Sequence, residues 1–406
     1  MKMSAEEESN KFMENNYFLT SPPFIKKGSR ETVGELWVDR ETELATWKNS
    51  VENAIVGHQN RLQYIVGDYG MGKTASLFKI MDEYSENRRI YSVYFTLKSE
   101  GKEQGGIDFI FRLFQNFDFE KLIENRKKAE INAALSKIPS NSRFSDARQL
   151  FSFLFRSRTQ TSLLSEDEKE NNFTEEKAFA LKLLCGYKLS AKERKIVNVY
   201  ANIDSLDTAK HYLAALLIFM KALGYLAMIL LIDEFEYLFN MVKKTDQPKY
   251  FALFRSLYDL PDELGISSED MVPIIAFFGI SQEGYSYLKN FESRSRDETG
   301  TPLAALARRI SGYTILAKMD KKNVELIIKV RLSKNRKTGK TEVEPLIPFS
   351  PDFVEYIFKI SKGTPSYVID YCDHVLDAGI TRKVKRLDAV FAKKVLKERG
   401  FFTGAE

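Results

Sequence analysis

One short segment limits most strongly what this chain can fold into. Residues 67–74 read Gly-Asp-Tyr-Gly-Met-Gly-Lys-Thr, which fits the pattern G-x-x-x-x-G-K-T. Residues 63–66 before it have the composition of a strand, and residues 75–84 after it that of a helix. In that setting, glycines let successive backbone N–H groups wrap a phosphate chain, and the helix N-terminus adds partial positive charge. The segment therefore predicts a phosphate-binding loop between a strand and a helix.

The residues of this loop are expected to bind ATP together with Mg²⁺. Lys73 should reach the β- and γ-phosphates, and the Thr74 hydroxyl should coordinate the metal. The predicted nucleotide contacts of the loop are Gly67, Asp68, Tyr69, Gly70, Met71, Gly72, Lys73, Thr74 and Ala75.

A second motif supplies two carboxylates. Residues 227–234 read AMILLIDE, an apolar run that ends in Asp233 and Glu234. Such a run is typical of a buried parallel strand, and ligands of open α/β sheets bind at its carboxyl end. Asp233 is predicted to hold the Mg²⁺ shell, and Glu234 to orient and partly deprotonate the attacking water. Combined with the glycine loop, the motif indicates hydrolysis of ATP rather than binding alone.

Two further segments contain polar groups that could act on the γ-phosphate. Ser281 follows the apolar run 271–280 and is a candidate for orienting the water, or else it caps a turn or the next helix. Arg308 and Arg309 are candidates for an arginine that one subunit projects to the γ-phosphate bound by its neighbour. Their alternative is a solvated pair on a helix.

The order of the expected elements defines an α/β fold. Strands alternate with helices up to residue 281, which implies a parallel sheet with helices on both faces. Residues 1–30 are expected to form an N-terminal arm and 31–319 a nucleotide-binding domain, which contains a helical insertion at about 100–200. Four helical patterns follow residue 320 and predict a helical domain over 320–406.

Composition argues against several other classes of protein. The chain has 406 residues, a formal net charge of +5, 2 cysteines and 3 histidines. The cysteines lack metal or redox spacing, which fits a reducing compartment, and the histidines are too scattered for a metal site or a nucleophilic triad. Residues 212–232 are largely apolar, but Lys221 and Gly224 divide them, so no membrane span is expected. Without an export signal, a cytoplasmic location is expected.

These landmarks, in this order, resemble the AAA+ superfamily, in particular its origin-recognition and Cdc6-like branch. The segment LWVDRETEL resembles that branch's F-V-G-R-E-x-E-L box, which flanks the adenine. The resemblance makes Trp37 and Val38 candidate nucleotide contacts, although Asp39 stands where the family has glycine. The segment GTPSYVIDYC resembles the part of the helical lid that supplies the sensor-2 arginine, but Ser366 stands at the arginine position.

A closer resemblance covers residues 175–240. It is to a bacterial and archaeal P-loop family found beside phage-exclusion (BREX-type) and helicase-associated gene sets. The shared features are a G-x-x-L-S-type segment, a helix ending in Gly-Tyr and the Asp-Glu strand, and GDYGMGKT is typical of that family's loop. The resemblance implies a homo-oligomeric AAA+ ATPase that works with DNA and with a partner protein in genome defence or mobile-element biology.

One segment is a candidate for contact with DNA. The polar stretch 334–340 contains Lys334, Arg336, Lys337 and Lys340, which could bind phosphates without sequence preference, or else form a solvated loop.

Two other functions stay open beside the DNA-associated ATPase. One is a Cdc6-like replication initiator or loader, which would usually carry a winged-helix domain after the lid. The other is a signalling or scaffold NTPase that does not bind nucleic acid.

Overall fold

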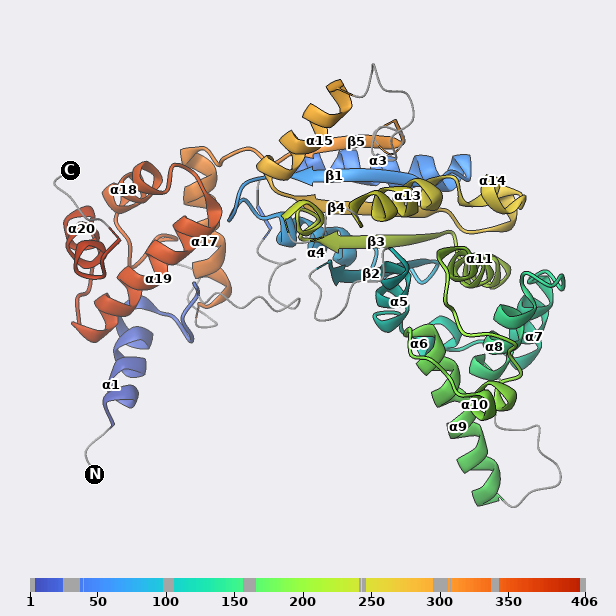
Figure 1. Ribbon diagram of the computed structural model, residues 1–406. Helices are drawn as coiled ribbons and strands as arrows, with labels where there is room; N and C mark the ends of the chain where they lie inside the picture. Colours follow the sequence, from blue (N-terminus) through green and yellow to red (C-terminus); the bar gives the residue numbers. More distant parts are fainter. Residues whose placement is uncertain are drawn as a thin grey trace. The chain divides into compact units, whose positions relative to one another are not determined.

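The computed structural model (Figure 1) describes residues 4–24, 37–38, 40–97, 106–155, 166–240, 242, 246–294, 306, 308–336 and 343–401. The chain packs as two compact units. The sheet unit comprises residues 46–66 and 80–314. The helical unit comprises residues 1–45, 67–79 and 315–406, so the glycine loop is grouped with the C-terminal helices.

The sheet has five strands in the order β2-β3-β4-β1-β5. They are β1 (Arg61–Val66), β2 (Ile90–Thr96), β3 (Ala227–Asp233), β4 (Ile274–Ile280) and β5 (Ile310–Ile315). The pairs β1–β4, β4–β3 and β3–β2 are parallel. Every residue of β3 and β4 is buried, as their continuous apolar runs predict. The predicted parallel α/β sheet is confirmed.

Helices connect these strands. α3 (Glu41–Gly57) precedes β1. The elements between the strands are α4 (Lys73–Glu83), α11 (Leu206–Ala222), α12 (Tyr237–Asn240), α13 (Gln247–Tyr258), α14 (Leu260–Leu264), η3 (Ser268–Asp270) and α15 (Gln282–Arg294). α11 begins where the Ser205 side chain accepts the Thr208 N–H at 3.0 Å, a typical N-cap. Its apolar residues are buried on nearly every face because α5, α7 and α14 all pack against it.

The predicted helical insertion lies between β2 and α11 (Figure 1). It consists of α5 (Ile107–Gln115), α6 (Phe119–Ile123), α7 (Lys128–Lys137), α8 (Ser145–Phe155), α9 (Glu166–Leu184) and α10 (Ala191–Ile196). Its core is aromatic: Phe109, Phe114 and Phe151 are fully buried. The Phe155 ring stacks on that of Phe219 in α11 with centroids 4.6 Å apart, so the insertion and the sheet share one apolar core.

The helical unit contains the four helices expected after residue 320. They are α17 (Lys321–Lys334), α18 (Pro351–Ser361), α19 (Pro365–Thr381) and α20 (Ala389–Glu398). The N-terminal α1 (Ala5–Phe12) and the π-helical turn η1 (Met13–Tyr17) pack on them. Tyr17 is fully buried and its hydroxyl donates to the Val384 carbonyl, while Lys383 pairs with Glu8 at 2.9 Å. The segment expected as an arm is thus built into the helical unit.

Three features of the described residues concern membrane spans, metal sites and cysteines. None of the described helices is both long and apolar enough to cross a membrane. Within the same residues, no group of three or more His, Cys, Asp or Glu side chains could hold a metal ion. Both cysteines are free, and burial raises the pKa of the Cys372 thiol well above its ordinary value.

Candidate nucleotide site

The glycine loop contains two glycines in the left-handed region of backbone conformation. Gly70 and Gly72 have φ values of +80° and +94°, a region that glycine enters without steric cost. The Lys73 ammonium donates to the Gly67 carbonyl at 2.9 Å and lies 3.4 Å from that of Asp68. It therefore folds over the first residues of the loop, where it can exchange these carbonyls for phosphate oxygens. Thr74, on the first turn of α4, is exposed.

A buried arginine, Arg40, donates a hydrogen bond to the backbone of this loop. Arg40 is only 5% exposed, and its Nη2 donates to the carbonyls of Met71 at 3.2 Å and Ala317 at 3.1 Å. Its Nη1 also lies 3.5 Å from the Glu43 carboxylate. Arg40 belongs to the same LWVDRETEL box as Trp37 and Val38, and Val38 is buried in the core of the helical unit. Contact of Trp37 and Val38 with the nucleotide stays a prediction.

The first turn of α19 also contacts the loop. The Ser366 N–H donates to the Gly70 carbonyl at 3.2 Å. A Cβ added at Gly70 would lie 1.9 Å from the Ser366 Oγ and 2.8 Å from its Cβ. The backbone at Gly70 is therefore packed directly against the residue that replaces the expected sensor-2 arginine. Sequence reasoning noted this substitution but not the contact.

Asp233 and Glu234 lie at the carboxyl end of β3 in the sheet unit. Asp233 is 4% exposed; its Oδ1 accepts the Glu234 N–H at 2.9 Å and its Oδ2 accepts the Tyr94 hydroxyl at 3.3 Å. Burial, followed by the charge of Asp233, raises the pKa of the Tyr94 phenol, which therefore stays protonated as a donor. Tyr94 was missed from the sequence, because only the register of β2 on β3 brings it beside Asp233.

Glu234 has an unusual backbone. Its φ is +55°, a left-handed conformation that costs a residue with a Cβ about 1–2 kcal/mol. The next residue, Phe235, is fully buried, and its N–H donates to the Gly279 carbonyl of β4 at 2.9 Å. The chain therefore turns sharply after β3. This turn leaves the Glu234 side chain exposed at the carboxyl end of the strand. Strain of this kind is common at functional sites.

Ser281 directly follows β4, the neighbouring strand. Its N–H donates to the Glu236 carboxylate at 3.1 Å, and its Oγ accepts the Gly284 N–H at 3.1 Å. The hydroxyl thus caps α15, as one of the two interpretations of the sequence expects. The preceding residue, Ile280, pairs with Val66, the last residue of β1 before the glycine loop. A role for Ser281 in orienting water stays a prediction.

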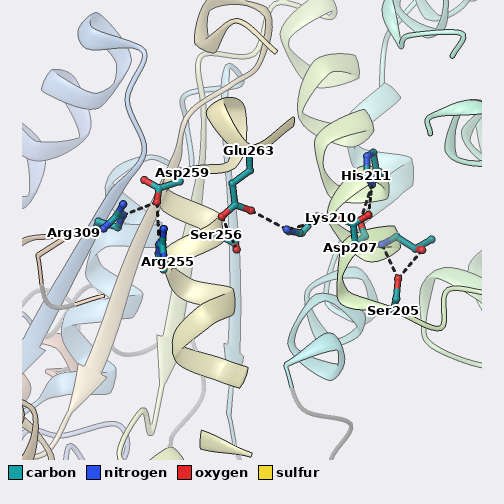
Figure 2. Close-up of polar contacts among 10 residues, drawn as sticks. Ser205, Asp207, Lys210, His211, Arg255, Ser256, Asp259, Glu263 and Arg309 are labelled. Atoms are coloured by element: carbon teal, nitrogen blue, oxygen red, sulfur yellow. Dashed lines mark hydrogen bonds and ion pairs between the residues drawn. The ribbon is translucent and has the colours of Figure 1, made fainter. Parts of the chain in front are cut away.

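The two candidate arginines have different surroundings, and Figure 2 shows those of Arg309. Both lie in the turn before β5 rather than on a helix. The Arg309 Nε is 2.6 Å from the Asp259 carboxylate, which also lies 3.5 Å from Arg255, and the hydrogen bond to Asp259 raises the pKa of Arg309. Arg308 is exposed, and its side chain forms no ion pair with any residue that the structure describes.

The basic segment after α17 is only partly described: Lys337 and Lys340 lie outside the described residues, and Lys334 is exposed. Arg336 donates to backbone carbonyls of the helical unit. Its Nη1 contacts the Tyr17 oxygen at 3.0 Å, and its Nη2 contacts those of Glu344, Pro345 and Ile347 at 2.9–3.1 Å. Burial lowers the pKa of Arg336. The DNA contact of this segment stays a prediction.

Taken along the chain, these elements define the class of protein. The sheet has the order β2-β3-β4-β1-β5, a glycine loop follows β1, an Asp-Glu pair lies at the carboxyl end of β3, and helices α17 to α20 follow β5. This is the α/β fold of the AAA+ P-loop ATPases.

The particular family resemblance is supported by a direct match. Residues 125–267 match the family model described as BREX system ATP-binding protein BrxC/D. The matched residues run from the insertion through β3 and include the Asp233–Glu234 pair, although they make up only about a third of the chain. The resemblance inferred from the sequence is thereby confirmed. No curated protein matches the sequence.

Several solved structures are similar over most of the chain. The Thermotoga maritima RuvB Holliday junction branch migration motor shares 15% identity, with 89% of this chain and 70% of that chain covered and a TM-score of 0.38. Aeropyrum pernix ORC1, solved in complex with DNA, shares 11%, with 93% and 68% covered and a TM-score of 0.43. Cdc6p from Pyrobaculum aerophilum shares 14%, with 97% and 72% covered and a TM-score of 0.42. The assignment of the α/β fold rests on the strand order and does not use these weak structural similarities.

Proposed function

We propose that the chain binds ATP with Mg²⁺ and hydrolyses it to ADP and phosphate. The observation that carries this proposal is the strained turn after β3. It holds the Asp233 carboxylate buried and hydrogen-bonded while leaving that of Glu234 exposed at the same sheet edge. One fixed and one exposed carboxylate suit a metal ligand and a base that orients water, respectively.

The groups of the glycine loop suit a nucleotide. Lys73 offers an ammonium whose present partners are backbone carbonyls, and the left-handed glycines offer N–H groups. Thr74 and Asp233 would hold Mg²⁺, which when bound neutralises charge on the β- and γ-phosphates. Oxygen ligands of this kind are those that Mg²⁺ prefers.

Each residue then has a defined part in hydrolysis. Glu234 orients the attacking water and accepts its proton, while Lys73 stabilises the charge on the transferring phosphoryl group. Ser366 brings no positive charge, so further stabilisation has to come from another cation. Arg308 suits that role in a neighbouring copy of the chain, because it is exposed whereas Arg309 is held by Asp259.

Replacing Glu234 by Gln tests the proposal. The variant should bind ATP as tightly as the unmodified chain, but its turnover should fall by about 100-fold or more, because the base is lost. Phosphate release and binding of a fluorescent ATP analogue measure the two properties separately. Glu283→Gln is a matched control, since Glu283 is an exposed carboxylate in the first turn of α15. Unchanged turnover in Glu234→Gln would exclude Glu234 as the base.

Mixing variants tests the role of Arg308 between subunits. Arg308→Ala should hydrolyse ATP slowly alone, and Lys73→Ala should not bind it. A mixture should regain activity, because an intact Arg308 from the Lys73 variant can reach ATP bound by the Arg308 variant. Arg309→Ala is expected to lose stability instead. No recovery in the mixture would contradict a role for Arg308 between subunits.

The proposed setting is genome defence, where the ATPase would assemble on DNA with a partner protein. The family match supports this setting, since the family is named for the BREX system. ATPase rates with and without duplex DNA, beside the oligomer mass of Glu234→Gln, test it. Stimulation by DNA with ATP-dependent assembly is expected. Assembly that is indifferent to DNA would favour the signalling or scaffold function.

A further inference from the structure

The short helix α10 of the insertion is ordered but unburied. It spans Ala191–Ile196, and none of its residues, all of which the structure describes, is buried. The Ser190 side chain accepts the Glu193 N–H at 3.3 Å, and the Ser190 N–H donates to the Glu193 carboxylate at 2.6 Å. Glu193 also pairs with Lys182 of α9 at 2.7 Å. The helix is therefore fixed at its start and held to α9, yet it adds no side chain to the core.

Two highly exposed tyrosines flank this helix. Tyr187 is 61% exposed and Tyr200 is 83% exposed. The backbone that carries them is fixed, because the Asn202 side chain bonds both the N–H and the carbonyl of Leu189, at 2.8 and 3.2 Å. The Asp146 carboxylate accepts the Tyr200 N–H at 2.9 Å. Single exposed aromatics are ordinary, but these two lie on segments that the hydrogen bonds between Asn202 and Leu189 hold together beside one helix.

The same surface carries positive charge. Lys188, Lys192 and Lys195 are exposed. Lys192 and Lys195 form no ion pair with the described part of the chain, and Lys188 lies 3.5 Å from Asp204 with both side chains largely in solvent. A pair this exposed is worth little and leaves the lysine available. Three lysines thus lie on or beside the helix that the tyrosines flank.

We propose that the α10 surface, formed by Tyr187, Lys188, Lys192, Lys195 and Tyr200, binds single-stranded nucleic acid. Lysines neutralise phosphates without regard to sequence, and exposed aromatic rings stack on unpaired bases. Bases in a duplex are already stacked on each other, so the tyrosines favour a single strand. The inference deepens the proposed association with DNA and rests on it, but it does not depend on ATP hydrolysis.

Binding of labelled oligo-dT to the full chain, followed by fluorescence anisotropy over a series of salt concentrations, tests the proposal. Replacing Tyr187 and Tyr200 by Ala should raise Kd by roughly tenfold per ring, with little change in the dependence on salt. Replacing both by Phe should leave Kd nearly unchanged, since stacking needs the ring and not the hydroxyl.

The lysines should give a different signature. Changing Lys188, Lys192 and Lys195 together to Gln should reduce the slope of log Kd against log salt by about 2, because each phosphate contact on a single strand contributes about 0.7. The matched control changes Lys393, Lys394 and Lys397, three exposed lysines of α20, to Gln. It removes the same charge and should leave the slope nearly unchanged.

Three results would overturn the inference. If neither the tyrosine nor the lysine substitutions change oligo-dT binding, the chain binds nucleic acid at another site. Tighter binding of poly-glutamate than of oligo-dT, insensitive to the tyrosines, would assign the surface to an acidic protein. Absence of oligo-dT binding by the unmodified chain would also exclude the surface. ATP turnover measured on the same preparations shows whether the proposed ATPase survives each of these outcomes.

Discussion

The contact between the glycine loop and α19 leads to a quantitative prediction for Gly70→Ala. Gly70 has a φ of +80°, and a Cβ there would lie 1.9 Å from the Ser366 Oγ and 2.8 Å from its Cβ. The serine hydroxyl can rotate away, but its Cβ can move only with the backbone of α19. The substitution therefore combines an unfavourable backbone conformation with a steric overlap.

The two contributions can be separated within the helical unit. A left-handed φ costs a residue with a Cβ about 1–2 kcal/mol. Overpacking of a tight contact costs about 1–3 kcal/mol more, so Gly70→Ala should lose about 2–5 kcal/mol of stability. Gly400 is the matched control, because its φ is +78° and nothing lies within 4 Å of an added Cβ. Gly400→Ala should show only the backbone contribution.

Thermal unfolding followed by circular dichroism measures the difference. In a unit of this size, 1 kcal/mol corresponds to about 2–4 °C in Tm. Ser366→Gly removes the overlapping side chain, so combining it with Gly70→Ala should restore about 1–3 kcal/mol beyond the sum of the single changes. If Gly70→Ala is no worse than Gly400→Ala and shows no coupling to Ser366, the contact does not exist in solution.

Three other substitutions test contacts around the site. Arg309→Ala should lower the free energy of unfolding by about 1–3 kcal/mol, since it strips a partly buried Asp259 of its nearest cation; an unchanged Tm would contradict this. Tyr94→Phe should leave the fold intact and reduce ATP turnover by about 2–10-fold, because Asp233 loses one donor; equal turnover would show that the bond does not matter. Arg40→Met should weaken binding of a fluorescent ATP analogue by about tenfold, as the loop loses its brace, and undiminished affinity would refute that role.

Strands that are buried along their whole length are the ones that can be predicted from the sequence. The runs of β3 and β4 are apolar throughout, and both strands are buried on every residue, so composition alone identifies them. The strand β5 was not predicted. Its residues ISGYTI are only partly buried or exposed, because it forms an edge of the sheet and has a neighbour on one side only. A weak apolar signal is what an edge strand of this kind produces.

The residues of the candidate site also fall into two groups, those that the sequence predicts and those that it does not. Lys73, Asp233 and Glu234 follow from local patterns, because each belongs to a motif that lies within a few residues of sequence. The partners that hold such groups come from distant segments. Tyr94 contacts Asp233 from the neighbouring strand β2, and Arg309 contacts Asp259, which lies 50 residues away in the sequence. Pairing between strands and helix packing decide those contacts, and no periodicity in a single sequence encodes them.

Ser366 stands where the resemblance implies a sensor-2 arginine, and this bears on how the helical unit could respond to a bound nucleotide. An arginine there would attract the γ-phosphate by charge, whereas Ser366 contacts the loop through its backbone N–H at the Gly70 carbonyl. The next carbonyl, that of Met71, accepts Arg40. Two successive peptide groups of the loop are thus tied to α19 and to the start of α3. Phosphate binding that reorients these peptides has to move both attachments, so the coupling depends on loop geometry rather than on net charge. Salt screens exposed charges but leaves a buried hydrogen bond, such as that from Arg40 to Met71, largely unaffected.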